Sequence, residues 1–103
     1  MARYVTLIRF TEQGARNMGQ STARARAFKK AAAKAGITVE GQLWTAGACD
    51  GVLILSGEEK QALRCLAQLA RFGNVRTETM QAFEADEFKA IAWPSVIGLA
   101  SRG

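Results

Sequence analysis

Hydrophobic and polar positions along the chain follow two rhythms, which together predict four strands and three helices. Alternating positions and short apolar runs rich in β-branched and aromatic residues are typical of strands. Such segments occur at residues 3–10, 37–47, 51–55 and 74–83. A repeat near 3.6 residues is typical of amphipathic helices. It predicts helices at residues 21–36 and 57–73 and a shorter helix at 84–93, with a loop at 11–19.

The ends of the two long helices carry recognisable signals. The Ser21 hydroxyl, or the side chain of a near neighbour, can accept a hydrogen bond from a free amide in the first turn of the earlier helix. Glu58 and Glu59 fall in the first turn of the later helix, where the helix dipole favours negative charge. Gly36 and Gly73 follow the two helices, and glycine readily adopts the left-handed conformation that ends a helix.

Each long helix has one predominantly apolar face that we expect to be buried. In the earlier helix this face consists of Ala27, Phe28, Ala31, Ala32 and Ala35. In the later helix it consists of Ala62, Leu63, Leu66, Leu69 and Ala70. Each helix can therefore cover a sheet with one side and meet water with the other.

The predicted order of elements is β-α-β-β-α-β, which favours a ferredoxin-like α+β fold. We expect a four-stranded antiparallel sheet, with two helices covering one face and the first and third strands in the middle. Residues 1–92 would form this single domain, and residues 93–103 would form an apolar C-terminal tail.

The third strand raises a problem of solvent exposure. Residues 52–55 are apolar on both sides of the strand, although the helices can cover only one side. Burial of a leucine or isoleucine contributes roughly 1.5–3 kcal/mol, so a central strand left bare on one side would be costly. We therefore expect a sheet-to-sheet homodimer, or a higher homo-oligomer that contains this contact.

Three separated blocks of the sequence resemble the GYD domain family. The blocks are "YVTLIRFTEQGARNM", "LWTAGACDGVLIL" and "FGNVRTETMQAFEADEF", and the resemblance covers about residues 1–90. The family consists of small bacterial and archaeal proteins named for a glycine-tyrosine-aspartate signature. The resemblance implies a ferredoxin-like fold, and it implies no established activity, cofactor or catalytic residue. The chain departs from the signature at Cys49, which precedes Asp50 where the family pattern has tyrosine.

Composition narrows the chemistry that the chain can support. The 103 residues include 14 lysines and arginines and 9 acidic residues, and the formal net charge of +5 favours anionic partners only weakly. Histidine is absent, which excludes imidazole general bases and the commonest zinc sites. Cys49 and Cys65 lack the spacing of metal ligands, so we expect reduced thiols, no metal and no cofactor.

The N-terminal segment "MARYVTLIRF" does not resemble a targeting sequence. It lacks the basic region, the long apolar core and the cleavage site of a secretory signal. Nor does any apolar run approach the roughly 20 residues that span a bilayer. We therefore expect a cytoplasmic protein without membrane contact.

Cys49 and Asp50 form the first candidate site. A reactive thiolate needs a nearby cation or a helix N-terminus, whereas the carboxylate of Asp50 would disfavour it. Gly47, Asp50 and Gly51 are typical turn formers. The pattern therefore favours a structural hairpin over a nucleophile or a redox sensor.

A pocket for a small polar or anionic ligand is the second candidate. Its walls could use polar groups from the neighbouring first and fourth strands and the hairpin, namely Tyr4, Thr6, Asp50, Arg76 and Glu78. The alternative is a solvated edge strand with cross-strand pairs, and the pattern favours this alternative.

Basic side chains on and near the earlier helix could contact nucleic-acid phosphates. They are Arg16, Arg24, Arg26, Lys29, Lys30 and Lys34. RNA-binding modules of this fold class carry aromatic residues on the third strand, where this chain reads "GVLIL". Nucleic-acid binding is therefore the weaker hypothesis, and a solvated helix face is favoured.

Four large apolar residues are candidates for a subunit interface. Leu53 and Leu55 on the third strand suit subunit contact, and Trp44 and Trp93 are suitable anchors because indole buries a large area. Packing within one subunit is the alternative for the two tryptophans.

Taken together, these patterns favour a homo-oligomeric module that binds a small ligand or a partner and has no catalysis of its own. The alternative is an enzyme of the dimeric α+β barrel type, with chemistry on Glu78, Asp50, Arg76 or Tyr4. An enclosed pocket of at least ~300 Å³ with convergent polar groups would favour the enzyme, and a filled core would favour binding or assembly.

Overall fold

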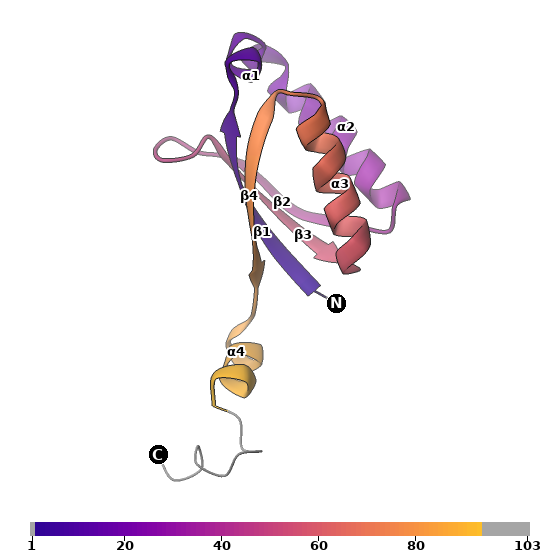
Figure 1. Cartoon of the computed structure of the whole chain (residues 1–103), viewed down its shortest axis with the longest axis vertical. Helices are drawn as coiled ribbons and strands as arrows, with labels where there is room; N and C mark the ends of the chain where they lie inside the picture. Colours follow the sequence, from indigo (N-terminus) through magenta and orange to yellow (C-terminus); the bar gives the residue numbers. More distant parts are fainter. Residues whose placement is uncertain (1, 94–103) are drawn as a thin grey trace.

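The computed structural model describes residues 2–93, which form one sheet and several helices (Figure 1). The strands are β1 (Ala2–Phe10), β2 (Thr38–Trp44), β3 (Gly51–Gly57) and β4 (Val75–Ala82). The long helices are α2 (Ser21–Lys34) and α3 (Glu59–Arg71). The shorter helical segments are α1 (Glu12–Arg16), the 3-10 helix η1 (Met18–Gln20) and α4 (Ala85–Ala92). Each predicted strand and helix is present, with ends that differ by a few residues.

Neighbouring strands of the sheet run antiparallel in the order β2-β3-β1-β4. β1 and β3 therefore lie in the middle, and β2 and β4 lie at the edges. Thr6 pairs with Leu53 on one side and with Thr79 on the other, and alternate residues of each strand point to opposite faces. The long helices α2 and α3 lie over one face (Figure 1), and we call the other face the open face. The α+β class with a four-stranded antiparallel sheet is confirmed.

The core lies between the sheet and the two long helices. Leu53 and Leu55 of β3 point toward the helices and are 2% and 0% exposed. They belong to one cluster with residues of α2, α3 and β2, namely Ala32, Ile37, Val39, Ala62, Cys65 and Leu66. The prediction that Leu63 and Ala70 belong to the buried face of α3 is wrong, because Leu63 is 65% exposed and Ala70 is exposed as well. Cys65 occupies the buried face instead.

Residues 11–19 form α1 and the start of η1, so the predicted loop is wrong. The Thr11 hydroxyl accepts a hydrogen bond from the Gly14 amide at 3.1 Å and donates one to the Gly73 carbonyl at 2.6 Å. Gly14 lies so close to the turn before β4 that a Cβ there would overlap the carbonyl oxygen of Asn74. This contact joins residues about sixty positions apart, so no local sequence pattern predicts it.

The observed helix ends agree only in part with those predicted from the sequence. Gly36 and Gly73 both adopt a φ of 81°, as predicted for residues that follow a helix. Ser21 does not cap α2, because it is already the first helical residue, and Gln20 at the cap position makes no side-chain capping bond. Glu58 caps α3 by accepting a hydrogen bond from the Gln61 amide at 2.9 Å.

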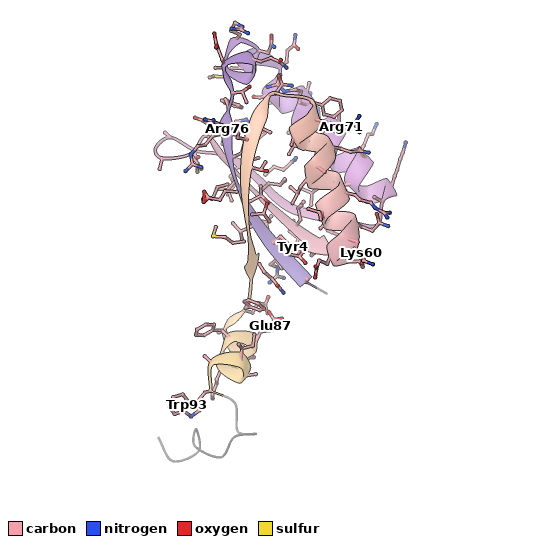
Figure 2. All side chains as sticks on the ribbon, viewed as in Figure 1. Tyr4, Lys60, Arg71, Arg76, Glu87 and Trp93 are labelled. Atoms are coloured by element: carbon pink, nitrogen blue, oxygen red, sulfur yellow. The ribbon has the colours of Figure 1, made fainter. Side chains whose placement is uncertain are left out.

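The short helix α4 continues from β4 and stands away from the sheet (Figure 1). Phe88 and Ile91 of this helix are 61% and 57% exposed. Trp93 follows the helix, and Figure 2 shows it at the end of α4 that lies farther from the sheet. The rest of the predicted tail, residues 94–103, lies outside the described residues. None of the helices within residues 2–93 combines the length and the apolar character needed to cross a membrane.

Candidate functional site

The residues between Thr45 and Asp50 connect β2 to β3 in a loop held by hydrogen bonds. The Thr45 amide donates to the Asp50 carbonyl at 2.9 Å, and the Thr45 hydroxyl donates to the Cys49 carbonyl at 2.7 Å. Asp50 then joins this loop to β1: its amide donates to the Ile8 carbonyl at 2.8 Å, and its Oδ2 accepts from the Phe10 amide at 2.8 Å. The geometry is that of the structural hairpin favoured by the sequence.

The five residues considered for a polar pocket do not come together. Tyr4 and Thr6 point toward the helices, where Thr6 is 0% exposed and its hydroxyl lies 2.8 Å from that of Thr79. Arg76 and Glu78 point to the open face, because they pair with Arg9 and Leu7 in the register of β1. Asp50 lies at the end of the sheet. The sheet itself therefore separates Arg76 and Glu78 from Tyr4 and Thr6, and Figure 2 shows Tyr4 and Arg76 toward opposite ends of the sheet.

The interface candidates are also divided between the two faces. Leu53 and Leu55 lie in the core of their own chain, so their placement at a subunit contact is corrected. Val52 and Ile54 are the β3 residues that point to the open face. Trp44 is 49% exposed and lies on the helix side, where its Nε1 donates to the Ser21 hydroxyl at 3.2 Å.

A cavity of about 560 Å³ lies between the two long helices and the sheet. Its walls come from α2, α3, the ends of β1, β2 and β3, and the residues that lead into β4. Ligand pockets in proteins occupy roughly 300–1,000 Å³, so the cavity is large enough for a small molecule. A second hollow, of about 290 Å³, lies beside the C-terminal end of α2 and the start of β2 and is smaller.

Small residues on both walls account for this cavity. The α2 wall consists largely of alanines, including Ala25, Ala27, Ala31 and Ala35. The sheet contributes Gly51, opposite Ile8 in the β1–β3 ladder. Methyl groups and a glycine cannot fill the space that leucine or phenylalanine would fill between a helix and a sheet. The prediction that Ala27 and Ala31 are buried is wrong, because both are exposed and line the cavity instead.

The polar groups of the cavity wall include one arginine with an unmet hydrogen-bonding group. Arg24 of α2 lines the cavity, and its Nη1 donates to the Asn17 carbonyl at 2.9 Å. Its Nη2 is buried and has no hydrogen-bond partner among residues 2–93. Gln42 also lines the cavity, but its Nε2 already donates to the Ala25 carbonyl at 2.9 Å. Among the described residues, Arg24 is thus the wall residue with a buried donor that lacks a partner.

Cys65 also lines the cavity, and burial raises the pKa of its thiol. The thiol is therefore protonated at neutral pH and is a poor nucleophile. No group of three or more candidate metal ligands occurs within residues 2–93. The cavity wall is suited to binding rather than to covalent chemistry on this thiol.

The open face carries a continuous apolar strip. In the strand register Leu7 lies beside Val52, and Val5 lies beside both Ile54 and Met80. Leu43 extends the strip onto β2, where it pairs with Val52. Ion pairs surround the strip: Arg3 lies 3.2 Å from Glu40 and 2.9 Å from Glu84, and Arg9 lies 3.3 Å from Glu78.

The model of the family described as GYD domain matches residues 4–92. The chain belongs to the GYD domain family. Neither the search of curated proteins nor the search of solved structures finds a match. The match begins within β1, includes the whole of β2, β3 and β4, and ends at the last residue of α4 of this GYD domain.

The cavity of this GYD domain is the feature that sequence reasoning missed. Arg24, Phe28 and Ala31 follow each other at helical spacing along α2, and all three line the cavity. That spacing was available in the sequence, where a basic residue precedes an otherwise small and apolar face by one turn. An arginine on the same face as such alanines is the signal that could have indicated a binding wall.

Proposed function

We propose that this GYD domain is a homo-oligomeric, ferredoxin-like module that holds a small ligand in the cavity between its helices and its sheet, without catalysis of its own. The cavity of about 560 Å³ is the observation that carries the proposal. A core built only for stability would be filled to the packing density usual in proteins.

The composition of the cavity wall favours binding over catalysis. Of the four residues considered for acid–base chemistry, only Asp50 lines the cavity, and its carboxylate already accepts the Phe10 amide. Glu78 and Arg76 belong to the open face, on the other side of the sheet. The size of the cavity would suit an enzyme as well, but the groups required for proton transfer are not gathered there.

The open face supports the homo-oligomeric part of the proposal. Its apolar strip runs across all four strands and has acidic and basic residues along its margins. A surface with both charges around an apolar centre can pair with a second copy of itself about a two-fold axis. The exposed apolar side chains of α4 would add area to the same contact.

Ligand binding in the cavity is tested by filling it. Ala31→Phe introduces a ring into the cavity, so binding of the neutral fluorescent dye Nile red should be lost. The fold should remain stable because Ala31 is exposed and the ring enters space that no other side chain fills. The measurement is the rise in dye fluorescence on titration with protein.

Ala67→Phe is the matched control, because Ala67 is exposed on α3 and does not line the cavity. This variant should bind the dye as the original protein does. Equal binding by the Ala31→Phe and Ala67→Phe variants would show that the dye binds elsewhere, and the proposed function would then be wrong.

A further inference from the structure

We infer that the ligand of the cavity is an apolar carboxylic acid, with its carboxylate bound by Arg24 and its alkyl or aryl body lying between α2, α3 and β3. This inference rests on the proposed function, because it names the chemical class of ligand for the same cavity.

The first argument is the state of the Arg24 guanidinium. One terminal nitrogen donates to the Asn17 carbonyl, and the other is buried without an acceptor among the described residues. A buried donor that lacks a partner destabilises the protein, and the loss is greater for a charged group. Arg24 lines the cavity, but this nitrogen is shielded from solvent, so a bound carboxylate would supply the missing acceptor only after the side chain turns the nitrogen toward the cavity. The planar guanidinium is suited to carboxylate oxygens.

The second argument is the charge of the cavity wall. Its ionisable cations are Arg24 and Arg64, and its only carboxylate is Asp50. Asp50 accepts a hydrogen bond from the Phe10 amide through Oδ2, which ties its carboxylate to β1 at the end of the sheet. Two cations facing one engaged carboxylate favour an anion over a cation or a neutral polar molecule.

The third argument is the apolar character of the remaining wall. Phe28 of α2, Leu69 of α3 and Leu53 of β3 line the space beside Arg24. A fully polar anion such as phosphate would leave these side chains against water, whereas an alkyl or aryl group would bury them. The wall therefore selects a molecule with one charged end and an apolar body.

The experiment compares 4-phenylbutanoate with 4-phenylbutanamide, which have the same shape and differ in charge. Trp44 lines the cavity, and Trp93→Phe leaves it as the only tryptophan of the chain, so Trp44 fluorescence reports binding. In this background we expect the acid to bind at least about tenfold more tightly than the amide at neutral pH.

Two arginine variants test whether Arg24 causes the preference for the acid. Arg24→Gln should remove the preference for the acid, so that the acid and the amide bind with equal affinity. Arg26→Gln is the matched control, because Arg26 is exposed on the same helix and does not line the cavity; it should retain the preference.

The outcomes separate the two proposals. If neither compound binds and Nile red also fails to enter the cavity, the proposed function is wrong. If Nile red binds but the acid and the amide bind equally, or if Arg24→Gln keeps the preference for the acid, the cavity is a binding site and the assignment of a carboxylic acid is overturned. If Arg24→Gln does not fold, the comparison of acid and amide in the Trp93→Phe background decides the inference.

Discussion

Arg3 connects two carboxylates at one corner of the open face. Its Nε lies 3.2 Å from Glu40, and its Nη1 lies 2.9 Å from Glu84. A hydrogen bond with the Ser56 hydroxyl and the charge of Arg3 hold the pKa of Glu40 below its ordinary value of 4.5. A carboxyl group whose pKa is lowered by folding stabilises the fold at pH above that ordinary value, and this contribution is lost as the pH falls through the folded-state pKa.

Glu40→Gln should therefore destabilise the protein in a pH-dependent manner. At neutral pH the variant should unfold at a slightly lower urea concentration than the original protein, because it lacks the charge that Arg3 attracts. The difference should narrow as the pH is lowered from about 7 to about 3, where Glu40 itself becomes protonated. Urea unfolding at several pH values measures this, and a difference that does not change with pH would contradict the assignment.

The segment from Thr11 to Arg16 shows how a short helix can be held by a distant part of the chain. The Thr11 amide donates to the Asn74 carbonyl at 3.1 Å, and Gln13 Nε2 donates to the Phe72 carbonyl at 3.0 Å. A helix of five residues is not stable alone. α1 therefore forms because the turn between α3 and β4 accepts its hydrogen bonds.

Gly14→Ala should disrupt this contact. The added methyl group would overlap the Asn74 carbonyl, which is backbone and can move only if the turn moves. We expect a loss of about 1–3 kcal/mol in the free energy of unfolding, as for other overpacked sites. Urea denaturation measures the loss.

Gly19→Ala provides the control for this prediction. Gly19 lies in η1 without a positive φ, and nothing lies within 4 Å of the position that its Cβ would occupy. Its substitution should change stability little. Equal losses for the two variants would show that glycine flexibility, rather than the contact with Asn74, determines the effect.

The elements of the fold could be predicted from the sequence, whereas the site could not. The period of a strand or a helix is a local property of the sequence. The segments that form β3 and α3 could therefore be predicted without any knowledge of contacts. α1 depends on hydrogen bonds to residues about sixty positions later in the chain, and no local sequence pattern predicts these bonds. The cavity depends on what lies opposite Ala31 and Gly51, and an alanine face has the same period whether the space across from it is filled or empty.

At the scale of the whole molecule, two apolar surfaces have no covering element among residues 2–93. One is the strip on the open face, where Leu43 and Met80 are 61% and 48% exposed. The other is α4, with Phe88 and Ile91 (Figure 1). Exposed apolar areas that are continuous and bordered by charged residues commonly mark interaction sites. A second copy of the chain would cover both.

Val52→Lys should separate the copies. Val52 lies at the centre of the strip, between Leu7 and Leu43, and a two-fold contact would bring the two new charges close together in a desolvated place. Light scattering at micromolar concentration should give a dimer or a larger oligomer for the original protein and a monomer for the variant.

Leu63→Lys is the control for charge and solubility, since Leu63 is 65% exposed on α3, on the other side of the molecule. It should leave the oligomer intact. A monomeric original protein, or loss of the oligomer in both variants, would contradict a contact through the open face.

The alanines of α2 give the cavity an adjustable size. Each one contributes only a methyl group to the wall, so replacement by valine or leucine would shorten the available space by a few carbon atoms while the helix backbone stayed in place. Related chains could thus accept shorter or longer molecules through single codon changes on one helix, without rebuilding the sheet that supports it.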